Sequence, residues 1–159
     1  MSFYTDVIQA DARYNSTARI NDVALLEPGT RAAVQGIVAD ALSIYGIKLM
    51  VFETFRSQAR QTEMYNQGSS KLKVVGVHHF GLACDLVKDV GGEPSWKGDF
   101  GFLAKLAKAH KLIWGGDWGH PQTPTDFPDS DHVQRCTIAQ QHALFAGTWY
   151  PDAGYDPTA

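Results

Sequence analysis

Two histidines and an aspartate lie close together in the stretch from Gly76 to Asp85, which reads Gly-Val-His-His-Phe-Gly-Leu-Ala-Cys-Asp. Imidazole nitrogens and carboxylate oxygens are ligands that zinc takes, at bond lengths of about 2.0–2.2 Å. On spacing alone, either His78 or His79 qualifies as the histidine ligand that accompanies Asp85. The segment therefore predicts one part of a metal site.

The residues around Asp85 alternate in the way that a strand requires. Successive side chains of a strand point to opposite faces, so Asp85 shares a face with Ala83. The other face carries Leu82, Cys84 and Leu86 and is the expected core face. This pattern directs the thiol of Cys84 into the core and the carboxylate of Asp85 towards a histidine from the preceding loop.

A third ligand is expected further along the chain, in the segment 129–134, which reads Asp-Ser-Asp-His-Val-Gln. His132 and Gln134 would share one face of a short strand, and Asp129 would stand near enough to act as a general base. His120 is the alternative third ligand, but it lies in a proline-rich loop with no strand to orient it. Three protein ligands with an open fourth position are typical of a catalytic zinc site.

Three segments of the chain together match the motifs of one family. They read His78-x-x-Gly81-x-Ala83-x-Asp85, Trp114-Gly115-Gly116-Asp117-Trp118 and Asp129-x-x-His132. In this pattern the chain resembles the zinc D-Ala-D-Ala carboxypeptidase and L-alanyl-D-glutamate endopeptidase family, which has the hedgehog/DD-peptidase-like fold and includes many phage endolysins. The resemblance covers roughly residues 31–134.

The resemblance implies a role for each matching residue. It selects His78, Asp85 and His132 as the zinc ligands and Asp129 as the catalytic base. Arg56, which stands in a Phe-Arg-Ser context at the end of a predicted strand, corresponds to an arginine that contacts substrate. Its guanidinium would bind a substrate carboxylate or stabilise the oxyanion of the tetrahedral intermediate.

Other residues near the motifs are expected to shape the substrate groove. Trp114 and Trp118 would form its walls, and His79 would flank it or donate a hydrogen bond. One position departs from the family pattern, because Gly76 stands where a serine is usual. Any hydrogen bond that this serine makes to the metal shell must therefore come from another residue.

The substrate that the resemblance implies is the stem peptide of bacterial peptidoglycan. An aspartate at the base position is frequent in the endopeptidase branch, so the expected reaction is cleavage between L-Ala and D-Glu by a phage or prophage endolysin. The alternative enzyme is a D-Ala-D-Ala carboxypeptidase or dipeptidase with the same zinc chemistry. The alternative from another class is a zinc-binding module without catalysis.

Composition restricts the class of protein further. The chain has 159 residues, 44% of them hydrophobic and 19% charged, with a net charge of −3. The acidic balance argues against nucleic acid as a partner, and no apolar run reaches the about 20 residues that a membrane span needs. Because the amino-terminal residues lack the pattern of a secretory signal, a cytoplasmic monomer is expected, released by a holin to act on the cell wall in the periplasm. Cys84 and Cys136 are expected to be free, buried thiols.

Periodicity predicts a single α+β domain with a small, largely antiparallel sheet, flanked by helices and holding zinc in its central cleft. The predicted helices span 31–45, 57–66, 102–110 and 136–149, and the predicted strands span 47–55, 82–87, 112–114 and 132–134. Gly46 is expected to end the first helix and Ser57 to cap the second. Residues 89–98 are expected to form a loop. The domain divides into an N-terminal segment, 1–30, a catalytic core, 31–149, and a mobile tail, 150–159.

Overall fold

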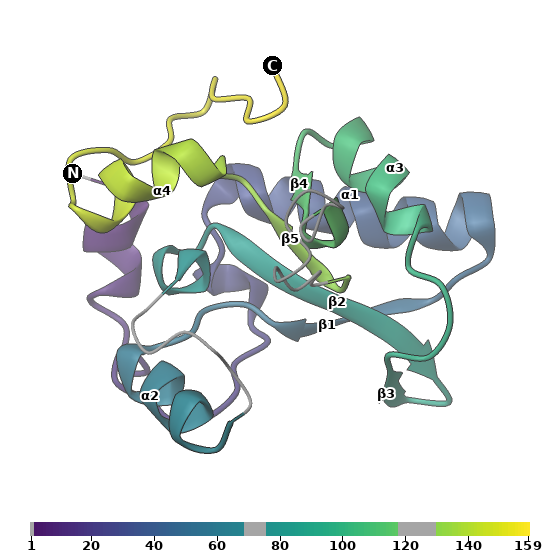
Figure 1. The fold of residues 1–159 in the computed structure, drawn as a ribbon, viewed down its shortest axis with the longest axis horizontal. Helices are drawn as coiled ribbons and strands as arrows, with labels where there is room; N and C mark the ends of the chain where they lie inside the picture. Colours follow the sequence, from purple (N-terminus) through teal and green to yellow (C-terminus); the bar gives the residue numbers. More distant parts are fainter. Residues whose placement is uncertain (1, 69–75, 118–129) are drawn as a thin grey trace.

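The computed structural model describes residues 2–68, 76–117 and 130–159. Its described strands form one five-stranded sheet in which every pairing is antiparallel. Four of them run in the order β1-β2-β5-β4, and β3 pairs with the far end of β2 (Figure 1). Their bounds are β1 Leu49–Glu53, β2 Ala83–Val90, β3 Glu93–Ser95, β4 Ile113–Trp114 and β5 His132–Gln134. The predicted fold class, a small antiparallel sheet with helices around it, is confirmed.

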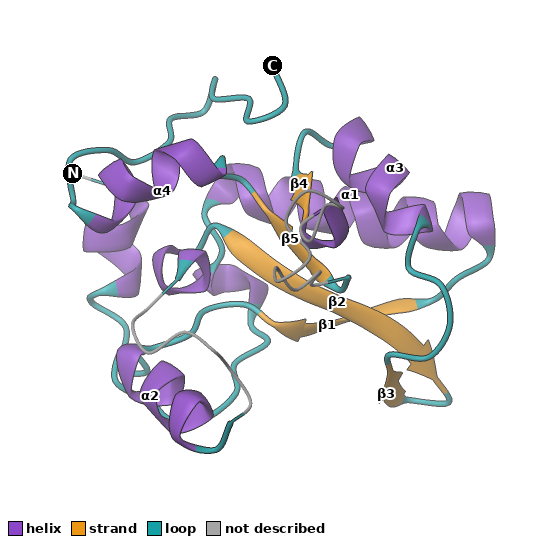
Figure 2. Cartoon of the chain, in the orientation of Figure 1, coloured by secondary structure: helices purple, strands orange, loops and turns teal. Residues whose placement is uncertain are grey.

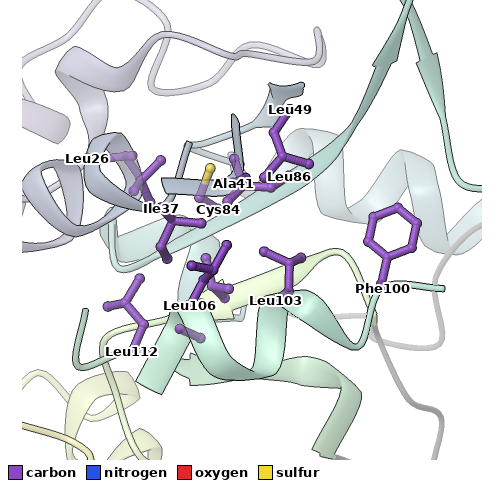
Figure 3. Packing of buried hydrophobic residues seen from close by; sticks show 13 residues of the cluster. Leu26, Ile37, Ala41, Leu49, Cys84, Leu86, Phe100, Leu103, Leu106 and Leu112 are labelled. Atoms are coloured by element: carbon purple, nitrogen blue, oxygen red, sulfur yellow. The ribbon is translucent and has the colours of Figure 1, made fainter. Parts of the chain in front are cut away.

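The main core lies between one face of this sheet and the two helices α1 (Pro28–Tyr45) and α3 (Phe102–Ala109). Both helices are seen along the same side of the sheet in Figures 1 and 2. Cys84 and Leu86 point from β2 into this core, as their alternation with Asp85 predicted. The buried members shown in Figure 3 come from both helices, the sheet and the adjoining loops: Leu26, Val34, Ile37, Ala41, Leu49, Cys84, Leu86, Phe100, Leu103, Leu106, Ala107, Leu112 and Val133.

Leu82 differs from the prediction, because it precedes the first residue of β2 and does not share the core face of that strand. It packs with Ala83 in a second cluster that also contains Phe80, Cys136 and Leu144. This cluster lies under α4 (Ile138–Phe145), which is shorter than predicted. Thr137 caps the start of α4 and Gly147, with φ +76°, follows its end, so local chemistry limits the helix at both ends.

Two helix boundaries confirm the signals seen in the sequence. Gly46 ends α1 in the left-handed region, with φ 67°, where a side chain would be strained. Ser57 caps α2 (Gln58–Asn66) by accepting a hydrogen bond from the backbone N–H of Arg60. This cap sets the start of α2 two residues after Arg56, in the segment that follows β1.

The loop predicted over residues 89–98 is wrong in part, because β3 pairs there with the end of β2. Val90 and Glu93 are partners across a two-residue turn, Gly91-Gly92, with φ values of +62° and +89°. Two positive φ values are what a tight type I′ hairpin turn needs, and glycine supplies them without strain. Gly-Gly between two extended runs was therefore a hairpin signal.

Both ends of the chain contact the central part of the molecule. In the N-terminal segment, η1 (Tyr4–Ile8) and η2 (Val23–Leu25) contribute Ile8 and Leu25 to a buried cluster with Phe55. At the other end, Arg135 donates hydrogen bonds to three backbone carbonyls between residues 152 and 155. The mobility of 150–159 and the single-domain assignment stay predictions. None of the helices in the described part of the chain has the length and apolarity needed to cross a membrane.

Candidate metal centre

Three secondary-structure elements bring His78, Asp85 and His132 together. Asp85 lies on β2 and is the register partner of His132 on β5, so both side chains project from the same face of the sheet. His78 lies on the short helix η3 (Val77–Phe80), which ends at Gly81 with φ 73°. A Cβ atom on Gly81 would lie 2.8 Å from the carbonyl oxygen of Leu25, so glycine is needed for the turn that aims His78 at Asp85.

The distances between the three side chains suit a tetrahedral metal ion. Oδ1 of Asp85 lies 3.3 Å from Nε2 of His78 and 3.4 Å from Nδ1 of His132. The three ligand atoms all lie within 4.8 Å of one another. With zinc–nitrogen and zinc–oxygen bonds of about 2.0–2.1 Å, two ligands of a regular tetrahedron stand about 3.3–3.4 Å apart. The spacing around Asp85 is therefore that of a zinc site.

Hydrogen bonds on the far sides of the two imidazoles determine which nitrogen faces the centre. Nδ1 of His78 lies 2.8 Å from the carbonyl oxygen of Thr54, which only accepts, so Nδ1 carries the proton and Nε2 is left as the ligand. Nε2 of His132 lies 2.8 Å from Oε1 of Gln134. The amide nitrogen of Gln134 donates to the carbonyl of Cys136, so its oxygen accepts from His132 and leaves Nδ1 as the ligand.

Asp85 is buried, with 8% of its surface exposed, and carries the negative charge of the centre. Among the described residues, its Oδ1 atom accepts no hydrogen bond, although it is the atom closest to both histidines. Burial by itself would raise the pKa of Asp85, but in the metal-free protein positive charge on His78 and His132 outweighs burial and holds that pKa below its usual value. A buried, ionised oxygen without a donor is costly unless a cation neutralises it, so the donor set fits a metal ion.

Arg56 lies beside the centre, with its guanidinium 3.5 Å from Oδ2 of Asp85. It also donates to Glu53 at 2.9 Å and to Gln61 at 3.3 Å. Burial favours the neutral form of Glu53, but Arg56 and Arg60 lower the pKa of its carboxyl overall. Arg56 therefore adds positive charge next to the ligand set, as its place at the end of β1 suggested, while Glu53 orients it.

His79 does not join the ligand group and is buried behind it. Its Nδ1 donates to the carbonyl of Arg56 at 3.1 Å, and its Nε2 accepts from the hydroxyl of Tyr4 at 2.9 Å. Tyr4 and Tyr14 are themselves hydrogen-bonded at 2.8 Å. Burial is the main reason why the pKa of His79 is lowered. The structure thus places His79 between the N-terminal segment and Arg56, whereas His78 is the histidine that it groups with Asp85 and His132.

Trp114 lies on β4, partly buried against the core, and its indole N–H donates to the carbonyl of Ser130 at 2.8 Å. Gly116 stands directly beneath its ring, since a Cβ atom there would lie 2.1 Å from the indole. The backbone at this glycine therefore lies close against the indole of Trp114. Trp118, His120 and Asp129 lie outside the described residues, so the groove wall, the rival ligand and the base stay predictions.

Sequence reasoning missed several partners of the site. Glu53 ends β1 next to Arg56, and its place at the end of an apolar strand was the available signal. Gln134 was expected to share a face with His132, but its bond to the imidazole was not foreseen. Tyr4 and Tyr14 carried no local signal, because only tertiary folding brings the N-terminal segment to His79.

No family model matches the chain, but curated proteins match it in sequence, among them one from a phage and one from a bacterium. An L-alanyl-D-glutamate peptidase of Listeria phage A118 is 32% identical over 124 residues, which are 75% of this chain and 40% of the relative. The peptidoglycan L-alanyl-D-glutamate endopeptidase CwlK of Bacillus subtilis is 29% identical over 108 residues, 56% of this chain and 61% of the relative. The chain thus spans less than two thirds of the length of either relative.

Comparison of structures gives matching folds. The L-Ala D-Glu endopeptidase ChiX of Serratia marcescens has a TM-score of 0.57 at 24% identity, covering 75% of this chain and 90% of that one. The D,D-pentapeptidase VanY of a VanB-type vancomycin resistance cassette, solved in complex with Zn(II), has a TM-score of 0.54 at 13% identity, covering 76% and 78%. At these identities the structural likeness concerns the fold.

Proposed function

We propose, from the premise that this chain belongs to the zinc D-Ala-D-Ala carboxypeptidase and L-alanyl-D-glutamate endopeptidase family, that it hydrolyses the L-Ala–D-Glu bond of peptidoglycan stem peptides. The observation that carries this proposal is the trio His78, Asp85 and His132, whose ligand atoms lie within 4.8 Å of one another, with both histidines 3.3–3.4 Å from Asp85. The phage relative, named for the same bond, supports the choice of substrate.

Zinc is the proposed ion, held by Nε2 of His78, Oδ1 of Asp85 and Nδ1 of His132. Bound there with an open position, it would polarise a peptide carbonyl and lower the pKa of a bound water to about 7. The bonds from His78 to Thr54 and from His132 to Gln134 keep both imidazoles in the tautomers that such binding requires.

Asp129 is proposed as the general base, three residues before His132 in the chain. It would take the proton from the attacking water and pass it to the leaving amine of D-Glu. Arg56 would stabilise the oxyanion or bind a substrate carboxylate, from its place beside Asp85. Trp114 and Trp118 are proposed to bound the groove, and His79 is proposed to hold the backbone of Arg56 in place.

The biological role we propose is lysis of a bacterial host. A protein of this kind would accumulate as a monomer in the cytoplasm until a holin opens the membrane, and would then cut the cell wall from the periplasm. The match to a phage peptidase supports this role.

Mass spectrometry of purified peptidoglycan, digested by the zinc-loaded protein, tests the reaction. New amino-terminal D-Glu, absent from a digest with Asp129→Ala, is the expected result. Released D-Ala would instead establish a carboxypeptidase or dipeptidase. Intact peptidoglycan in the presence of bound zinc would refute catalysis and leave a zinc-binding module.

Metal analysis of two variants separates binding from catalysis. His132→Ala removes a ligand and should lose zinc, whereas Asp129→Ala should retain it and lose turnover. Zinc retained at the wild-type level by His132→Ala would contradict the ligand assignment. Full turnover by Asp129→Ala would contradict the base assignment.

A further inference from the structure

An aromatic pair with one exposed ring lies next to the candidate metal centre, on the side of the sheet that faces away from α1 and α3. The rings of Phe52 and Trp96 meet edge to face, with centroids 4.9 Å apart. Trp96 is 51% exposed, whereas Phe52 is partly buried. We call Arg19, Phe52 and Trp96 together the aromatic ledge.

Strand register places the aromatic ledge beside the ligands. Phe52 immediately precedes Glu53, the register partner of Asp85. Trp96 follows Ser95, the register partner of Lys88, so Trp96 is level with Val87. Val87 lies two residues after Asp85 on β2. Two residues of strand span about 7 Å. In Figure 1, β3 lies beside the arrowhead end of β2, and β1 runs along the length of β2 that leads to Asp85.

Polar contacts hold the ledge in one geometry. The indole N–H of Trp96 donates to Oδ2 of Asp131 at 3.0 Å, and Asp131 immediately precedes the ligand His132. Arg19 lies over the ring of Phe52 at 4.2 Å and donates to the backbone carbonyl of Phe52 at 2.6 Å. An exposed indole that is fixed before binding loses little conformational entropy when a ligand covers it.

We propose that the aromatic ledge binds a sugar ring of the peptidoglycan glycan strand. This proposal rests on the proposed cleavage at L-Ala–D-Glu. The C–H face of a pyranose packs well on a flat indole, and the guanidinium of Arg19 supplies donors for hydroxyl and acetamido oxygens. The ligand is a neutral N-acetylated sugar, so the ledge needs no matching charge. Trp96 then makes the enzyme prefer glycan-linked stems to free peptides.

The length of the substrate agrees with this position. L-Ala is joined to the muramic acid by a short lactyl link, so the sugar begins about two residue lengths, or roughly 7 Å, from the scissile carbonyl. This reach equals the step along β2 from Asp85 to the level of Trp96. The amino-terminal side of the stem peptide therefore runs over β2 towards β3.

The test compares kcat/KM for a disaccharide-linked stem peptide with kcat/KM for the same peptide without sugar. We expect the wild-type protein to favour the glycan-linked substrate by tenfold or more, and Trp96→Ala to reduce this ratio to near one. Trp96→Leu keeps apolar cover on the hairpin but lacks a flat ring, and should give the same loss if Trp96→Ala does not fold. Tyr45→Ala, which removes a 39% exposed ring at the end of α1, is the matched control and should keep the wild-type ratio.

The outcomes separate the ledge from the proposed reaction. An unchanged ratio in Trp96→Leu, or equal losses on both substrates, would overturn the ledge while leaving the peptidase intact. A fall in kcat/KM for the free peptide alone would mean that the ledge contacts the peptide, and would also overturn sugar binding. If neither substrate is cleaved, calorimetric binding of peptide-free glycan chains to the wild type and to Trp96→Leu still decides: weaker binding by the variant supports the ledge, and equal or absent binding refutes it.

Discussion

The hydrogen bond from His132 to Gln134 provides the sharpest test of the metal centre. Both side chains are buried, and the 2.8 Å bond leaves Nδ1 of His132 free of a proton. Gln134→Leu puts an apolar side chain of similar size in place of the amide and removes both the acceptor for His132 and the donor to the carbonyl of Cys136. The Nε2–H of His132 then lacks this partner, and the tautomer that presents Nδ1 to the metal is no longer favoured.

Two effects of Gln134→Leu have separate magnitudes. A buried donor that loses its acceptor costs about 1–3 kcal/mol of stability. Loss of a partner that orients a metal-binding histidine lowers metal affinity about 10–100-fold, which is about 1.4–2.7 kcal/mol. We therefore expect zinc affinity to fall by at least tenfold, measured by competition with a chromophoric chelator. Urea unfolding of the metal-free protein should show only the loss of stability that comes from the unpaired donor.

Thr30→Val is the matched control for this variant. Thr30 is fully buried and its hydroxyl donates to Glu27 at 2.9 Å, away from the ligands. It should lose stability like Gln134→Leu but bind zinc with wild-type affinity. A folded Gln134→Leu protein whose zinc affinity lies within about twofold of the wild type would refute the tautomer argument.

Three further predictions concern the base, the arginine pair and the tryptophan loop. Asp129→Ala should lower kcat by about 10²–10⁴-fold in a peptidoglycan turnover assay, as loss of a general base does. Glu53→Gln should cost about 3 kcal/mol in urea unfolding at pH 7 because it removes the buried negative charge that pairs with both Arg56 and Arg60. Since the pKa of Glu53 is lowered, this difference should be complete above the unfolded value of 4.5 and shrink as pH falls below it. Gly116→Ala should destabilise the fold by about 1–3 kcal/mol, because its Cβ would overlap the ring of Trp114, and should therefore lower the melting temperature. An unchanged melting temperature would contradict this packing.

Local patterns in the sequence were sufficient for the elements that carry the ligands. Alternation around Asp85 predicted which face of β2 is polar, because a strand has a strict period of two. Capping chemistry predicted the start of α2 at Ser57 and the end of α1 at Gly46, since these effects act within one helical turn. The ligand types and their spacing in the motifs were likewise readable without coordinates.

Only the tertiary structure decided how residues distant in the chain meet. The family resemblance selected His78 over His79, but the contacts that orient the two rings, with Thr54 behind His78 and Tyr4 behind His79, are made across 24 and 75 residues. The contacts of Glu53, Gln134 and Trp96 can be assigned only once the register of β1, β3 and β5 against β2 is known. Side-chain type and local period are properties of a short segment, whereas hydrogen-bond partners, burial and electrostatic surroundings arise from packing between segments, so the chemistry was visible in the sequence and its arrangement was not.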